Sequence, residues 1–264
     1  MLDYEISSSE FKLTIINDEA DIGGGITTKL DIDKIKLFPD EENVTLMGIN
    51  QEMLKYFVDT YGKQFKRIRF FKNKRIEDLS PLSRLPQLEY LYFFANQRVT
   101  ELWDMSKNVS LETLIVCDFS KLNNLRNIDT APNLKNFFRG DEIWTTAETD
   151  SLEPLQHSRI ENLGFLFKKI HNPDIEPLIK MKNLKRLEAH PHTFEIEKCV
   201  EFSIRRPDVR SLISTPYVEW HNEHIMIVGK RRPMLKKPVD EKKLQDYVDR
   251  WNIIKEQLFE NMEI

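Results

Sequence analysis

The sequence predicts an α/β solenoid, in which 3₁₀ turns and short helices form the convex side of a curved parallel sheet. Three observations predict it. A spacing with apolar residues at the first, fourth and sixth positions of a short segment recurs along most of the chain. The recurrences are almost evenly spaced, which is the signature of a repeat architecture. The segments before and after the repeats lack this spacing, as expected for elements that cover the open ends of a stack.

The composition is that of a globular protein, with 40% hydrophobic and 31% charged residues among 264. The net charge of −4 gives no general attraction to nucleic acid or to an anionic membrane, so neither is predicted as a partner. The sequence opens without the basic and apolar regions of a signal peptide, and it contains no run of about 18 apolar residues. We therefore expect a cytoplasmic protein.

Residues 1–64 are predicted to be an N-terminal cap of strands and one helix. Alternating apolar residues predict strands at Leu13 and Ile15, across residues 30–37, and from Val44 to Ile49. Three glycines at positions 23–25 favour a turn over a phosphate-binding loop, because no Lys-Ser/Thr pair follows them. Asn50 is a suitable N-cap for a helix that ends near Gly62.

The repeats span residues 65–210. Their first positions are separated by 23, 23, 23, 26, 24 and 25 residues, and are Phe65, Leu88, Leu111, Leu134, Ile160, Leu184 and Val209. In the first six units, apolar residues also occupy the fourth and sixth positions, except at Arg139, where we expect a loop insertion or a bulge. Asparagine stands at the ninth position in Asn73 and Asn96. Each unit should supply one parallel strand and a return that closes with 3₁₀ turns in the early units and short helices in the later ones.

Residues 76–96 carry a pattern that can be compared with known repeat families. Their apolar and asparagine positions are Ile76, Leu79, Leu82, Leu85, Leu88, Leu91, Phe93 and Asn96, with Ser80 and Pro81 between. This pattern resembles the internalin-type leucine-rich repeats of bacteria, and the likeness extends over residues 65–210. The resemblance implies a curved solenoid that binds proteins on its concave sheet.

Residues 211–264 are predicted to form a hairpin and a capping helix. Two strands, from Tyr217 to His221 and from Ile225 to Val228, are expected to close the C-terminal end of the sheet. Asp240 is the expected N-cap of the last helix. One stripe of that helix should pack on the solenoid, and its members are Leu244, Tyr247, Val248, Trp251, Ile254, Lys255 and Leu258.

The concave face is the predicted protein-binding site. In each strand, positions three, five and seven point away from the core. These positions place aromatic residues side by side with arginines at the margin, which is unusual for a surface that only contacts water. The predicted binding residues are Arg67, Arg69, Phe71, Tyr90, Tyr92, Phe94, Ile115, Phe138, Leu166 and Arg186. Binding of a partner protein is favoured over the alternative that a terminal element or a second copy covers the cluster.

No catalytic, metal or cofactor site is predicted. The pairs His190/His192 and His221/His224 lack a third ligand at a standard spacing, and Cys117 has no histidine near it in sequence. Cys117 and Cys199 lie three units apart, too far for a disulfide. The basic residues at positions 230–232, 236 and 237 favour a solvated linker.

The predicted function is a non-catalytic protein-binding scaffold. An inhibitor or immunity-type protein is one subtype of that function. The alternative is a metal-dependent hydrolase that uses the late histidines. The sequence predicts neither the partner nor the oligomeric state.

Overall fold

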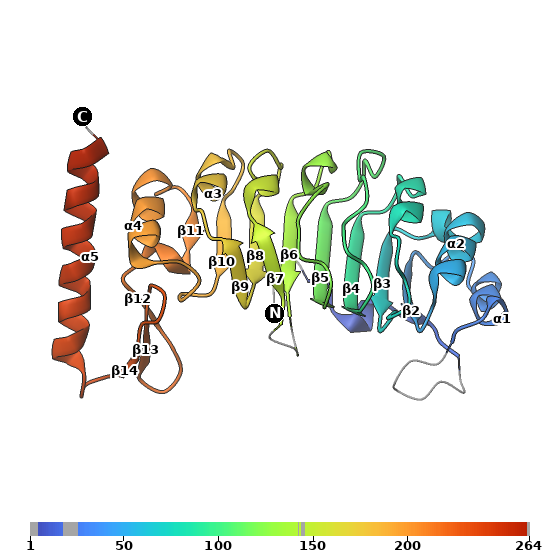
Figure 1. The fold of residues 1–264 in the computed structure, drawn as a ribbon. Coiled ribbons are helices and arrows are strands. Elements are labelled where there is room, and N and C mark those ends of the chain that lie inside the picture. Colours follow the sequence, from blue (N-terminus) through green and yellow to red (C-terminus); the bar gives the residue numbers. More distant parts are fainter. Residues whose placement is uncertain (1–4, 18–25, 142, 144–145, 263–264) are drawn as a thin grey trace.

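The computed structural model describes residues 5–17, 26–141, 143 and 146–262. Within them, nine parallel strands form one long sheet, which confirms the predicted α/β class (Figure 1). In spatial order the strands are β1 (Leu13–Ile15), β2 (Asn43–Met47), β3 (Arg67–Phe71), β4 (Tyr90–Asn96), β5 (Thr113–Phe119), β6 (Asn136–Gly140), β8 (Asn162–Leu166), β10 (Arg186–Ala189) and β11 (Arg210–Ser211).

The strands from β3 to β10 pair in the register that the repeat spacing predicts. Ile68 lies opposite Leu91, Leu91 opposite Leu114, and Leu114 opposite Phe137. All four are buried in a single core that runs the length of the solenoid. Because equivalent positions stack directly, each unit buries the apolar edge of the one before it.

The convex side consists of short turns and helices, as expected. Early units close with the 3₁₀ turns η4 (Ser80–Arg84), η5 (Ile128–Thr130) and η6 (Glu153–Leu155). Later units use the α-helices α3 (Glu176–Lys180) and α4 (Ile196–Arg205). Proline near the start of η4, η6 and α3 fits this pattern, because its missing N–H has no helical partner there.

Buried asparagines join the strand ends of neighbouring units. The Asn96 amide group donates to the carbonyls of Asn73 and Ile76 in the preceding unit, at 2.8 and 2.9 Å. Its oxygen accepts from the backbone amides of Arg98 and Val99. These contacts satisfy buried backbone groups at a tight turn, where an unpaired group is costly.

Arg139 also binds backbone carbonyls of the preceding unit, in a later part of the sheet where no asparagine stands at the ninth position. It lies at an inward position of β6 and is fully buried. One guanidinium nitrogen donates to the carbonyls of Phe119 and Leu122, at 2.8 and 3.2 Å. Burial lowers the pKa of Arg139 to about 10, so the side chain stays charged at neutral pH.

β6 remains in register with β5 and β8, so there is no bulge at Arg139. The predicted insertion follows it and contains β7 (Glu148–Ser151), which pairs with β9 (Lys169–Asn172) in a separate small sheet.

The N-terminal block differs from the prediction at one element. Residues 29–37 are helical, as α1 (Lys29–Ile32) and η2 (Asp33–Leu37), and not a strand. Ile32 and Ile35 are three residues apart and buried together on the inner side of this turn, whereas Leu30 and Leu37 face the solvent. The expected helix is α2 (Gln51–Thr60), where the Asn50 side chain accepts from the Met53 amide. The glycines at positions 23–25 lie outside the described residues.

The C-terminal block also departs from the prediction in one respect. β12 (Tyr217–Glu219) and β13 (His224–Ile227) form the expected hairpin, but with β14 (Met234–Lys236) they make a separate antiparallel sheet. The hairpin therefore does not continue the long sheet, whose last described strand is β11. Part of the basic stretch expected as a linker is β14.

Helix α5 (Glu241–Met262) stands at the end of the solenoid opposite α1 (Figure 1). The predicted stripe faces the protein, with Trp251 in the solenoid core and Leu244 against the hairpin. Among the described helices, none combines the length and apolar character needed to cross a membrane.

Candidate protein-binding site

The strand register aligns the outward side chains into columns along the concave face. Tyr92 of β4 lies opposite Arg69 on one side and Ile115 on the other, and Phe138 follows next to Ile115. Phe71 lies beside Phe94, with their rings stacked at 4.7 Å. The sheet thus brings the first eight predicted binding residues together, and Leu166 and Arg186 continue the row on β8 and β10.

These side chains form a second apolar cluster, separate from the solenoid core. Its buried strand residues are Tyr90, Tyr92, Phe94, Ile115 and Cys117, and Phe71 and Phe138 pack at its edge. Tyr92 is only 3% exposed and Ile115 only 1%. The expectation of an exposed aromatic surface is therefore wrong for this part of the face.

The chain covers its own aromatic cluster with residues 5–11, which we call the N-terminal segment. Ile6 and Phe11 supply its apolar contacts with the cluster. The Phe11 ring lies 6.0 Å from the Tyr90 ring. The Arg69 guanidinium lies 5.4 Å from the centre of the Phe11 ring and 4.9 Å from that of Tyr92. In Figure 1 the segment is the blue ribbon near the lower ends of β4 and β5.

The segment also makes polar contacts. Its centre is the single 3₁₀ turn η1 (Ser8–Glu10), which Ser7 caps by accepting from the Ser9 amide. The Asn43 side chain donates to the Glu10 carbonyl at 3.0 Å. The residues from Ser7 to Glu10 are exposed, so the segment contacts the sheet mainly through its two ends.

The Tyr90 hydroxyl lies beneath the segment without a well-formed hydrogen bond. It is buried, and it makes no hydrogen bond of normal geometry with a described residue, although the Ile6 backbone lies near it. Burial raises the pKa of Tyr90 far above its usual value. A buried hydroxyl without a partner lowers the stability of the contact that covers it.

The part of the face formed by β6, β8 and β10 is open and mostly polar. The Asn162 side chain donates to the Asn136 side chain, and Asn136 donates in turn to the Thr113 hydroxyl. Arg186 pairs with Glu188 of its own strand at 2.7 Å. Leu166 is 39% exposed, and Phe138 is half-buried. We call this the open half, and of the predicted residues it presents Phe138, Leu166 and Arg186.

The late histidines do not come together as a metal centre. His190 and His192 lie side by side, with ring centres 5.1 Å apart, and burial lowers the pKa of both. They line a cavity of about 630 Å³ beside the open half, with Leu166, Lys168 and Lys230. His221 and His224 belong to the hairpin. Within the described ranges, no group of three or more His, Cys, Asp or Glu side chains is placed to hold a metal ion.

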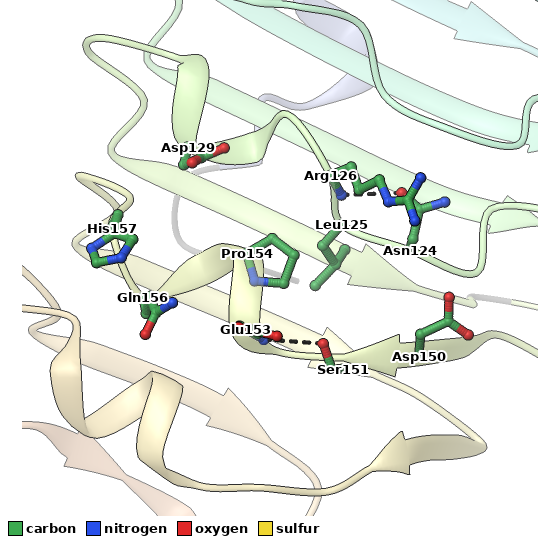
Figure 2. Close-up of a pocket in the computed structure, with 10 residues that line it drawn as sticks. All are labelled: Asn124, Leu125, Arg126, Asp129, Asp150, Ser151, Glu153, Pro154, Gln156 and His157. Atoms are coloured by element: carbon green, nitrogen blue, oxygen red, sulfur yellow. Dashed lines mark hydrogen bonds between the residues drawn. The ribbon is translucent and has the colours of Figure 1, made fainter.

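A second depression, of about 380 Å³, lies between turns of successive units (Figure 2). Two hydrogen bonds join residues that line it, from the Arg126 amide to Asn124 and from the Glu153 amide to Ser151. Figure 2 shows Asp129 and His157 at one end of the depression and Asp150 at the other. The side chains do not converge on one point, as a catalytic group would require.

Sequence reasoning found the aromatic cluster and named a terminal element as the alternative that would cover it, but did not identify residues 5–11 as that element. Ile6 and Phe11 lie outside the repeats, and only Ile6 and Phe11 of this polar stretch are large and apolar. Cys117 and Cys199 are both buried and do not form a disulfide, as expected. No family model matches the chain, and no curated protein matches it.

Proposed function

We propose that this chain is a non-catalytic, protein-binding scaffold of the leucine-rich repeat class. A partner protein binds on the concave sheet, across the open half. The repeat spacing and the parallel sheet support the class, and the buried asparagines of the early units support its internalin-like subclass.

One observation carries the proposal. The concave side of β3–β5 holds an apolar cluster that the solenoid core does not use, and residues 5–11 bind it as a peptide would. The same face continues into the open half, where Phe138 and Leu166 combine with hydrogen-bonding side chains of Asn162 and Arg186. Apolar anchors within a polar surface are typical of protein interfaces.

The experiment begins with capture of partners from native lysate and ends with purified components. The affinity of an identified partner is measured for wild type and for the double variant Phe138→Ala/Leu166→Ala. Truncating interface anchors should weaken binding at least tenfold. Leu30→Ala is the matched control, because Leu30 is exposed on α1 at the far end of the molecule. A partner whose affinity changes with neither variant would place the site elsewhere and contradict the proposal.

A further inference from the structure

The N-terminal segment and the face beneath it have opposite charge. Residues 5–11 carry the carboxylates of Glu5 and Glu10 and no cation. The sheet beneath them presents Arg67 and Arg69, and Lys72 follows directly after β3, with its ammonium group 5.6 Å from the centre of the Phe71 ring. The aromatic cluster is therefore bordered by positive charge that suits an acidic ligand.

The fit of the segment is incomplete. It covers the cluster with two apolar side chains and leaves the Tyr90 hydroxyl buried without a hydrogen bond of normal geometry among the described residues. A ligand that supplied an acceptor or donor at this point would remove that cost. The poor hydrogen-bond geometry at this hydroxyl is an observation, independent of charge, that favours a second possible occupant of the same surface.

The segment is also separable from the solenoid core. Of the two apolar clusters, Phe11 and Ile6 belong to the outer one, whereas Leu13 of β1 belongs to the main core. The residues between Ile6 and Phe11 are exposed and form one isolated turn. Elements with few buried contacts open at a small cost while the rest of the protein stays folded.

We infer that the N-terminal segment is an exchangeable occupant of a peptide-binding site. The ligand of that site is an acidic segment of a partner protein, with an aliphatic and an aromatic anchor about five residues apart, as in Ile6 and Phe11. This inference rests on the proposed function and specifies the partner's chemistry. It places a second contact on the concave face, beside the open half.

The test uses the full chain and a labelled peptide with the sequence of residues 5–12. Binding is measured by fluorescence anisotropy to wild type and to the variant Ile6→Ala/Phe11→Ala. In wild type the tethered segment competes at a high effective concentration. We expect the dissociation constant for the variant to be at least tenfold lower than for wild type. Equal dissociation constants, or no binding to a variant that keeps the melting temperature of wild type, would overturn the inference.

Two controls define the site and the chemistry. Adding Tyr92→Ala to the variant should reduce peptide binding at least tenfold, and a peptide with both glutamates replaced by glutamine should bind at least threefold more weakly at low salt. Equal binding of the glutamine peptide would overturn the assignment of an acidic ligand. Equal binding of a scrambled peptide, which keeps both glutamates, would overturn the spacing of the two anchors. Exchange can fail while a partner still binds through Phe138 and Leu166, so this result and the test of the proposed function are independent.

Discussion

The two faces of strand β4 are both apolar and both buried, but different parts of the chain bury them. Leu91 and Phe93 face a core to which every repeat contributes. Tyr90, Tyr92 and Phe94 face outward, and among the described residues the segment that covers them contributes the apolar side chains of Ile6 and Phe11. Burial of the inner face is therefore required for the repeats to fold, whereas the outer face is buried by a local contact. Variants on the two faces should separate global stability from local opening.

The largest effect is expected on the inner face, from Leu91→Ala. Leu91 is fully buried between Ile68 and Leu114, and stacked strands cannot move together to fill the space it leaves. Such truncations cost about 2–5 kcal/mol in free energy of unfolding. Denaturant titration measures this cost. Leu30→Ala, at a position that is 80% exposed, should change stability little, and an equal loss in both variants would contradict the observed register.

Removing the side-chain amide of Asn96 should have the next largest effect. Asn96→Ala leaves two carbonyls and two amides without a partner at a buried turn, which we expect to cost about 2–4 kcal/mol. Asn124→Ala is the control, because Asn124 makes a similar bond to the Thr100 carbonyl where water can replace it. The measurement is the melting temperature of each variant. If Asn96→Ala and Asn124→Ala have the same melting temperature, Asn96 does not stabilise the turn.

The inner face could be predicted from the sequence because its signal is local and repeated. Each inward residue recurs at a nearly fixed interval, so one register explains all of them, and the structure confirms that register. Residues 30–37 show the limit of such reasoning. Four apolar residues with mixed spacing fit a strand on paper, yet only Ile32 and Ile35 are buried, on one side of a helical turn.

The cover of the outer face could not be predicted in this way. Contacts between the N-terminal segment and β3–β5 join residues about 60–110 positions apart, and two apolar residues in a polar stretch carry no periodicity. Arg139 is a related case. An arginine at an inward position suggested a disrupted strand, but its long side chain reaches the carbonyls of Phe119 and Leu122 and replaces a missing asparagine.

On the outer face, Tyr92→Ala should cost less than Leu91→Ala although both residues are buried. Its loss removes contacts with Arg69 and with the covering segment, while the solenoid core keeps its packing. We expect about 1–2 kcal/mol, measured by denaturant titration. Tyr92→Phe, which keeps the ring, should lie close to wild type. A loss as large as that of Leu91→Ala would show that the outer cluster is part of the global fold.

The smallest effect on global stability is expected from Phe11→Ala, below about 1 kcal/mol, because the segment can detach without unfolding the repeats. Its consequence should instead be local and visible at the two cysteines. Cys117 lies in the outer cluster with Phe11, whereas Cys199 lies in the solenoid core on α4. Burial raises the pKa of Cys199 to about 12, so this thiol stays protonated at pH 8 and is a poor nucleophile. In Phe11→Ala, Cys117 should react with a thiol reagent at least fivefold faster than in wild type, while Cys199 stays unreactive.

Single-cysteine variants assign the two rates, and Phe259→Ala, which truncates an exposed phenylalanine on α5, is the matched control. If the reaction rates of Cys117 and Cys199 rise together, opening is global, and burial of the outer face is required for folding as much as burial of the inner face. If neither rate changes, Phe11 does not control access to the cluster. Acceleration confined to Cys117 would separate the two faces, because the same strands would then carry one buried surface that opens and one that does not.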